Sequence, residues 1–211
     1  MNDLPRCHGR YQKDPLYLAY HDEEWGRPEH DDKKLYELFL LELFQAGLSW
    51  SCILHKRESF RNAFDGFDIH KIAAYGQRDV ERLLADPSII RSRLKILAAI
   101  NNANIVLSII SEFGSFDRYL WSFTDGRTLV VDPSVTRNAA SDAMAIDMKR
   151  RGIKFAGSVT LYSFMQAYGQ INSHEPGCFV FHQLQAPGPS GRQSSCAVPP
   201  DGHDPRPEGR R

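Results

Sequence analysis

The stretch that decides the fold is Leu35-Tyr-Glu-Leu-Phe-Leu-Leu-Glu-Leu-Phe-Gln-Ala46. As a helix, it would be hydrophobic on nearly every face, which is typical of a helix buried inside a protein. A polar N-cap is available in Asp31 or Asp32, just before the apolar run begins. The sequence therefore predicts a central buried helix with other elements packed around it.

Helical periodicity continues after this stretch. Helices are expected over the ranges 50–64, 69–75, 79–85, 90–113, 141–152 and 158–168. Ser88 is a candidate N-cap for the long helix, and Gly114 and Gly169 are candidate helix ends. No alternating strand pattern is longer than 128–131. The predicted class is all-α, with about eight helices joined by short loops.

The composition is that of an ordinary globular protein. The 211 residues carry 26 Lys+Arg and 26 Asp+Glu, and the 12 Phe, 8 Tyr and 3 Trp suffice for a core, which excludes disorder of the whole chain. We expect one helical domain over residues 1–184 and a disordered Pro/Gly/Ser/Arg-rich tail over residues 185–211. No apolar stretch approaches the roughly 20 residues of a membrane helix, and Met1 is not followed by a signal-peptide pattern. We therefore expect a cytoplasmic protein with no membrane partner.

Glu42 lies inside the apolar run and would share a helix face with Leu38 and Phe39. A buried charged Glu costs several kcal/mol unless it is paired or hydrogen-bonded. Two interpretations are open: the side chain reaches the surface or caps a neighbouring helix, or it is held in an apolar cleft to meet a ligand. The aromatic residues nearby in sequence are either core residues or walls for a flat, cationic ligand: Tyr17, Tyr20, Trp25 and Trp50.

Two Cys and two His form a chemically complete tetrahedral zinc set, which lies at the two ends of the domain: Cys7, His21, His174 and Cys178. The spacing is unlike that of a zinc finger, and the alternative is that these residues bind no metal. His8 and Cys196 are possible spare ligands. A full set of four ligands leaves no open position for an activated water, which favours one structural zinc over a catalytic zinc.

Basic residues gather in a few segments although the net charge is zero. What matters for a nucleic-acid partner is this distribution. The alternative is that the clusters are solvated helix faces. The candidate contacts to DNA are Lys149, Arg150, Arg151, Lys154 and Arg91.

Several blocks together resemble the DNA-3-methyladenine glycosylase I family. They cover about Arg6 to Cys178 and follow the family's order: 14–26 (DPLYLAYHDEEWG), 41–50 (LELFQAGLSW), 56–58 (KRE), 89–91 (IIR), 120–123 (LWSF), 149–157 (KRRGIKFAG) and 162–169 (YSFMQAYG). Long blocks in order are more specific than any single motif. The resemblance implies an all-α fold of the helix-hairpin-helix glycosylase type, with one structural zinc on Cys7, His21, His174 and Cys178.

The resemblance also implies a function: hydrolysis of the N-glycosidic bond of 3-methyladenine in double-stranded DNA during base excision repair. The family's base-recognising glutamate corresponds to Glu42, and its pocket aromatics correspond to Tyr17, Tyr20, Trp25 and Trp50. None of the residues 89–95 after the expected hairpin is acidic, and no lysine nucleophile can be assigned. We therefore expect a monofunctional enzyme without lyase activity, acting as a monomer.

Three departures from the family pattern keep other functions open. The tryptophan expected just after Cys7 is missing, and Tyr11 is a candidate substitute. Ala145-Ile146 replaces a Ser-Lys pair that could meet a phosphate, and the expected hairpin at residues 86–90 lacks a glycine. The chief alternative is a zinc-stapled helical module that binds DNA or damaged bases without catalysis, and a second is a zinc hydrolase with an open metal site.

Overall fold

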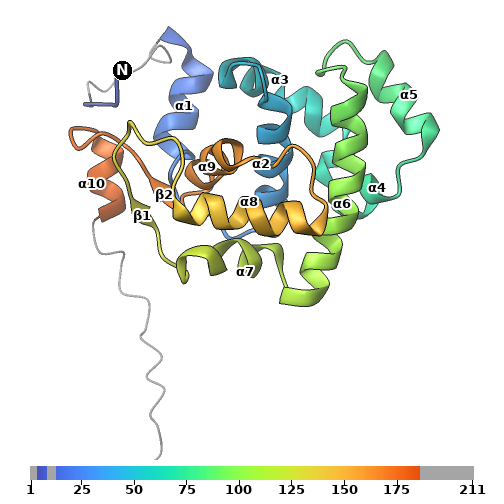
Figure 1. The fold of residues 1–211 in the computed structure, drawn as a ribbon. Helices are drawn as coiled ribbons and strands as arrows, with labels where there is room; N and C mark the ends of the chain where they lie inside the picture. Colours follow the sequence, from blue (N-terminus) through green and yellow to red (C-terminus); the bar gives the residue numbers. More distant parts are fainter. Residues whose placement is uncertain (1–3, 9–12, 186–211) are drawn as a thin grey trace, which may run out of the picture.

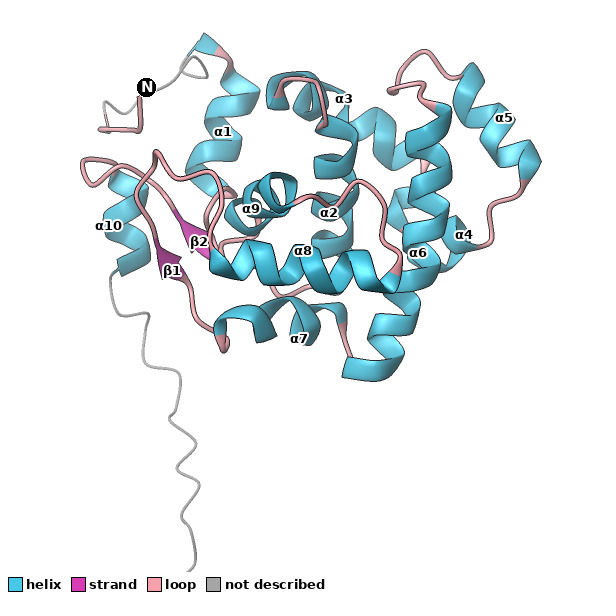
Figure 2. Cartoon of the chain, in the orientation of Figure 1, coloured by secondary structure: helices cyan, strands magenta, loops and turns pink. Residues whose placement is uncertain are grey.

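The computed structural model describes residues 4–8 and 13–185 (Figure 1). Over these residues the chain is almost entirely helical, so the predicted all-α class is confirmed (Figure 2). The α-helices of this part of the chain are α1 (Pro15–Glu23), α2 (Asp32–Gln45), α3 (Trp50–Ala63), α4 (Ile69–Ala73), α5 (Gln77–Ala85), α6 (Arg93–Phe113), α7 (Phe116–Trp121), α8 (Ala139–Arg151), α9 (Ser158–Ala167) and α10 (Phe179–Gln185).

Helix α2 is the central helix that the apolar run predicts. The Asp31 carboxylate accepts a hydrogen bond from the amide of Lys34 at 2.9 Å, which satisfies one of the free N–H groups at the helix start. All ten residues from Leu35 to Phe44 are buried. Helix α2 packs against α3, α6, α7 and α9, and Figure 1 shows α2 and α9 in the middle, with α1 on one side and α6 on the other.

Helix α6 begins three residues later than predicted, and the prediction of Ser88 as its N-cap was wrong. The Asp86 carboxylate accepts hydrogen bonds from both the amide and the hydroxyl of Ser88, so Ser88 belongs to the preceding turn. Ser92 caps the helix instead, and Gly114 ends it with φ 88° as expected. The turn at residues 86–92 thus joins α5 to α6.

Helix α6 also corrects the expectation that no segment could span a membrane. The helix has 21 residues, and a stretch of 18 of them has a mean hydropathy of 1.5, which is sufficient to span a membrane by length and composition alone. The core helix of a soluble protein meets the same criterion, and α6 buries a stripe of residues against its neighbours α4, α5 and α7. The apolar pattern of α6 is explained by this packing.

Three helices were missed by the sequence analysis: α1, α7 and α10. Each is short, and α1 buries only Tyr20 and His21 among its nine residues, so it has little apolar periodicity. Its start is nevertheless well specified: Asp14 accepts from the amides of Leu16 and Tyr17, and Pro15 occupies the first turn.

Backbone contacts join segments that are far apart in the sequence. Strands β1 (Leu129–Val130) and β2 (Ile171–Asn172) pair in parallel, and they are the only strands in the described ranges. Gly169 has φ 80°, and a Cβ there would lie 2.2 Å from the carbonyl carbon of Arg27. A glycine is therefore required for this approach, which places the end of α1 against the end of α9.

The predicted tail cannot be compared with the structure, because residues 186–211 lie outside the described residues. Tyr11, the candidate substitute for the missing tryptophan, also lies outside them. The predicted division at residues 184 and 185 stays a prediction.

Candidate active site

A cavity of about 450 Å³ opens between α1, α2, α3 and α9. It brings together all five side chains predicted to recognise a ligand, although they come from three different segments of the chain. The cavity is lined by Cys7, His8, Tyr17, Tyr20, His21, Trp25, Glu42, Gln45, Trp50, Pro133, Ser163, Gln166, Ser173 and Glu175.

Glu42 is the buried charge at the centre of this site. The residue is 4% exposed, and its Oε2 has no hydrogen-bond partner among the described residues. Burial raises the pKa of this carboxyl group to about 8. The interpretation that Glu42 reaches the surface is therefore wrong. The carboxyl group lines the cavity, where its Oε2 is available to accept a hydrogen bond from a ligand.

Two aromatic residues form a wall of the cavity. Tyr20 and Trp50 pack with ring centroids 5.3 Å apart and planes inclined by 47°. Tyr17 meets Tyr20 edge to face at 6.2 Å. Burial raises the pKa of Tyr20 well above its usual value, and the carboxylate of Glu42 adds to this effect. The phenol is therefore neutral and can donate a hydrogen bond.

Trp25 lies in the cavity wall but contacts a different group. Its ring centroid is 4.4 Å from that of His174 and 5.9 Å from that of His21. Among the five predicted recognition residues, Trp25 is thus the one whose ring contacts are with the predicted metal ligands.

A polar wall of the cavity, which comes mainly from α9, was not predicted from the sequence. Ser163 and Gln166 are three residues apart, on one face of α9, and both line the cavity. Gln166 Nε2 donates to Ser173 Oγ at 2.5 Å. Both α9 residues lie within the quoted 162–169 block, which is the only signal in the sequence that could have indicated them.

Three of the four predicted metal ligands converge beside the cavity. The ligand atoms of Cys7, His21 and Cys178 all lie within 4.8 Å of one another, and His21 Nε2 is 3.7 Å from Cys178 Sγ. His21 Nδ1 pairs with the Asp22 carboxylate at 2.9 Å, which directs Nε2 toward the two sulfurs. Arg6 in turn holds Asp22 through hydrogen bonds of 2.8 to 3.0 Å.

His174, the fourth predicted ligand, lies next to this group but outside it. Its ring centroid is 5.1 Å from that of His21. His174 Nδ1 donates to Asn172 Oδ1 at 3.0 Å, while its Nε2 is buried without a hydrogen-bond partner in the described ranges. Gly26, with φ 75°, packs directly on this ring, since a Cβ there would lie 2.6 Å from His174 Cε1.

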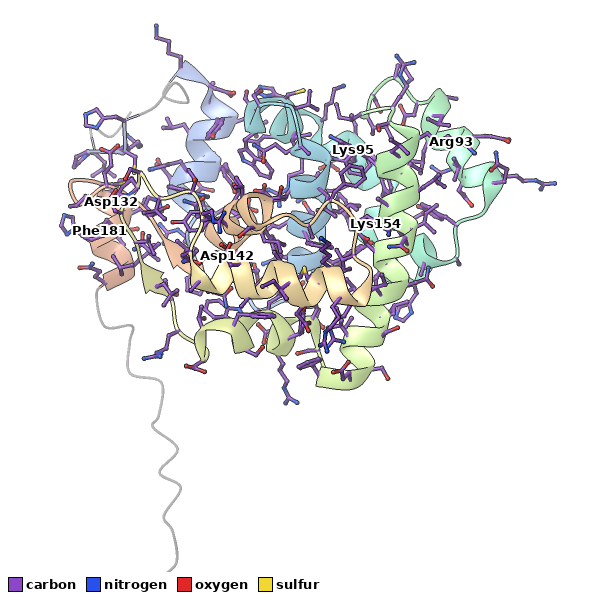
Figure 3. The ribbon with its side chains drawn as sticks, viewed as in Figure 1. Arg93, Lys95, Asp132, Asp142, Lys154 and Phe181 are labelled. Carbon is purple, nitrogen blue, oxygen red and sulfur yellow. The ribbon has the colours of Figure 1, made fainter. Side chains whose placement is uncertain are left out.

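The predicted DNA contacts lie on the last turn of α8, in the turn from α8 to α9 and in the turn from α5 to α6. Lys149 and Lys154 are exposed around the turn from α8 to α9, and Arg91 is exposed in the turn from α5 to α6; none of the three has a salt bridge among the described residues. Figure 3 labels Lys154 on its turn. Arg150 pairs with Asp147, and Arg151 is held between Asp147 and Glu112.

Comparisons with known proteins agree with this geometry. The family model described as methyladenine glycosylase matches residues 10–182. DNA-3-methyladenine glycosylase 1 of Escherichia coli K12 is 47% identical over 183 residues, which cover 84% of this chain and 97% of that protein. The DNA-3-methyladenine glycosylase of Haemophilus influenzae is 39% identical and covers 77% of this chain and 91% of its own length.

Solved structures give the same result. A crystal structure of 3-methyladenine DNA glycosylase I has 48% identity and a TM-score of 0.78, covering 82% of this chain and 98% of that one. The Staphylococcus aureus enzyme, described in a study of 3-methyladenine recognition, has 38% identity and a TM-score of 0.76, covering 79% and 91%.

The fold and site define a helical DNA-repair glycosylase, a hydrolase that acts on N-glycosyl bonds. The chain belongs to the methyladenine glycosylase family, as the resemblance predicted. The alternative of a helical module without catalysis is therefore wrong.

Proposed function

We propose that the chain excises 3-methyladenine from double-stranded DNA by hydrolysis, as a monofunctional glycosylase. The observation that carries the proposal is the buried carboxylate of Glu42, which faces a cavity walled by Tyr20 and Trp50. Relatives with 47% and 39% identity carry the name DNA-3-methyladenine glycosylase, and one related structure is a complex with 3-methyladenine.

The chemistry of the lesion suits this cavity. Methylation at N3 makes the base in DNA cationic, so the base can leave without being protonated by the enzyme. A cationic base beside Glu42 lowers the pKa of its carboxyl group, so the ionised carboxylate pairs with this charge, and the faces of Tyr20 and Trp50 attract it. Neutral adenine gains less from both interactions, which gives selectivity for the damaged base.

The reaction is a displacement at C1′ of the sugar. A water oxygen bonds to C1′ as the C1′–N9 bond breaks, the bonding electrons pass to the base, and the water loses a proton to solvent. The negative charges of Glu42 and of the DNA phosphates stabilise the positive charge that develops on the sugar.

The absence of lyase activity is supported by the position of Lys95, in the first turn of α6. Its Nζ donates to the carbonyl oxygens of Phe44 and Ala46 at 2.8 and 2.7 Å. The amine is therefore occupied in binding the last carbonyls of α2, which carries Glu42. A lysine held in this way is not positioned to attack the sugar.

The DNA contact is proposed at the α8–α9 turn and the α5–α6 turn, each of which joins two packed helices. Asn102 holds the first turn through both backbone groups of Lys154, and Phe155 is exposed with φ 60°. Exposed Lys149, Lys154 and Arg91 can meet phosphates. Arg151 is less suited because two carboxylates already occupy it.

One structural zinc is proposed on Cys7, His21, His174 and Cys178. The donor set fits: three ligand atoms already converge, and the orphaned Nε2 of His174 is the buried atom that the fourth bond would satisfy. Such a zinc would bind the two ends of the domain to each other and leave no open position for substrate. A monomeric state and a cytoplasmic location stay predictions.

The test is an assay on duplex DNA treated with a methylating agent. The expected products are free 3-methyladenine and an intact strand that carries an abasic site. A protein that binds the methylated duplex but releases no base would contradict the proposed hydrolysis. Strand cleavage at the abasic site, beyond that of a buffer control, would contradict the proposed lack of lyase activity but not the excision of the base.

A further inference from the structure

Helix α1 supplies Tyr17 and Tyr20 to the cavity, yet it is poorly anchored by apolar contacts. Only Tyr20 and His21 are buried among its nine residues. Burial of one or two side chains fixes the position of a helix weakly, because few apolar contacts resist a small shift. Other contacts must therefore hold α1 in register with the rest of the site.

Polar contacts hold α1 at both of its ends, and both partners lie on α3. At the start of α1, Ser51 Oγ donates to the Asp14 carboxylate at 2.9 Å. At its end, the Arg57 guanidinium donates to both oxygens of Glu24 at 2.7 and 2.8 Å. Two parallel hydrogen bonds of this kind fix orientation as well as distance.

Arg57 also connects α1 to the helix that carries Glu42. Its Nε donates to Glu37 Oε1 on α2 at 2.5 Å, and the side chain of Glu37 is 8% exposed. The Arg57 side chain is only 14% exposed, so water screens these interactions less than at an open surface. One guanidinium therefore fixes the relative positions of α1, α2 and α3.

The positions of Arg57 and Glu24 in their segments connect the ion pair to the base cavity. Arg57 follows Trp50 by seven residues, which is about two helical turns and the same face of α3. Glu24 follows Tyr20 by four residues, which is about one turn of α1. The ion pair and the Tyr20–Trp50 contact are thus successive connections between the same two segments.

Tyr20 also borders a second cavity, which both residues of the ion pair line. This cavity of about 360 Å³ is lined by Leu16, Ala19, Tyr20, Glu24, Leu54 and Arg57, among others. Tyr20 lines both this cavity and the candidate active site, so its ring is the partition between them. A shift of Tyr20 would therefore change the shape of the candidate active site.

We propose that the Glu24–Arg57 ion pair is a positioning device for base recognition, which holds Tyr20 against Trp50 and beside Glu42. This inference rests on the proposed function, because it assigns the pair to the recognition of the damaged base. Neither Glu24 nor Arg57 lines the base cavity, so the pair acts through Tyr20.

Glu24→Ala is the test variant, because it removes the Arg57 contact at the end of α1 while leaving Arg57 and Arg61 paired with Glu37. Glu58→Ala is the matched control: Glu58 belongs to the same cluster through Arg61, is 73% exposed, and among the described residues has its salt bridge to Arg61 on its own helix and none to α1. Affinity for free 3-methyladenine is measured by quenching of tryptophan fluorescence, alongside the melting temperature.

Glu24→Ala should weaken binding of 3-methyladenine about threefold to tenfold, with a melting temperature within about 2 °C of wild type. Glu58→Ala should bind like wild type. The same Glu24→Ala change is then made in a Tyr20→Leu protein, where it should have no further effect on affinity, because the residue through which it acts is gone.

Two results would overturn this inference and leave the proposed function standing. The first is wild-type affinity in the Glu24→Ala protein. The second is that Glu24→Ala lowers the affinity of the Tyr20→Leu protein by the same factor as it lowers that of wild type. A large drop in melting temperature that accounts for the lost binding would also overturn it, because the pair would then serve only stability. A wild-type protein that does not bind 3-methyladenine would instead overturn the proposed function from which the inference starts.

Discussion

Tyr20 and Trp50 face each other across the boundary between α1 and α3, with ring centroids 5.3 Å apart. Both rings line the cavity that also contains the carboxylate of Glu42. The three side chains come from three helices, so the geometry of the site depends on how those helices pack. Changes to the rings, to the carboxylate and to the helix contacts should therefore have different and separable effects.

Replacing Glu42 with Gln should slow the excision of 3-methyladenine about tenfold to a hundredfold. Gln keeps the size of the side chain but loses the charge, and a hydrogen bond to a charged partner is worth about 1.5–3 kcal/mol. Release of base from methylated duplex in single-turnover reactions is the measurement.

The control for this variant is binding to a duplex with a stable abasic-site analogue, which has no base to recognise. That affinity should be unchanged. If Glu42→Gln loses binding to the abasic duplex to the same extent as it loses excision, the residue supports the fold or the DNA contact and not the base.

The buried Glu42 should also make stability depend on pH. Its pKa is about 8 in the folded protein against an ordinary 4.5, so between these pH values the folded state keeps a proton that the unfolded state has lost. The free energy of unfolding should therefore fall with rising pH, by up to about 1.4 kcal/mol per pH unit from this group.

Denaturant unfolding of wild type and Glu42→Gln at pH 5, 7 and 9 measures this contribution. The variant should become more stable relative to wild type as the pH rises through this window, and the difference should level off above pH 8. Parallel pH profiles for the two proteins would mean that Glu42 does not titrate with a raised pKa.

Loss of the proposed zinc should lower stability. We expect one zinc per chain by atomic emission, and Cys178→Ser should lose it and melt at least about 5 °C lower, because metal binding adds directly to the folding free energy. Cys52→Ser is the matched control, since Cys52 lies on α3 outside the cluster. Equal melting temperatures with and without chelator would contradict a structural zinc.

The exposed lysines around the α8–α9 turn should contribute to DNA affinity without sequence preference. Lys149→Ala and Lys154→Ala should each reduce the slope of log affinity against log salt by about one, because each removes one phosphate contact. Lys71→Ala, an exposed lysine on α4, is the control. Unchanged slopes in the first two variants would place the DNA on another face.

Much of the helical core could be predicted from the sequence, since long buried helices have the strongest patterns. The apolar run that starts at Leu35 and its Asp31 cap predicted α2 closely, and Trp50 was correctly placed at the start of α3. The start of α6 could not be predicted as well. Ser88 and Ser92 are equally good caps in sequence, and only the hydrogen bonds from Ser88 to Asp86 decide between them.

Residues of the candidate site could be predicted where their chemical type is unusual among their neighbours in the sequence. A carboxylate inside an apolar run indicated Glu42, and thiol and imidazole groups indicated the metal cluster. Ser163, Gln166 and Ser173 could not be identified in this way, because polar residues on a helix or loop usually face solvent. Their role in the cavity depends on the packing of α9 against α2, which no local pattern encodes.

The meeting of the two ends of the described domain has a consequence for how the enzyme is made. Glu175 donates its amide to Cys7 Sγ across 168 positions of sequence, and Phe179 N bonds to Pro5 O. Closing so long a loop is slow, and it can occur only after nearly the whole domain has been synthesised. A nascent chain that has reached α8 holds Glu42 and Trp50 but lacks the Ser163 and Gln166 wall, so the cavity that receives the base is among the last features to be completed.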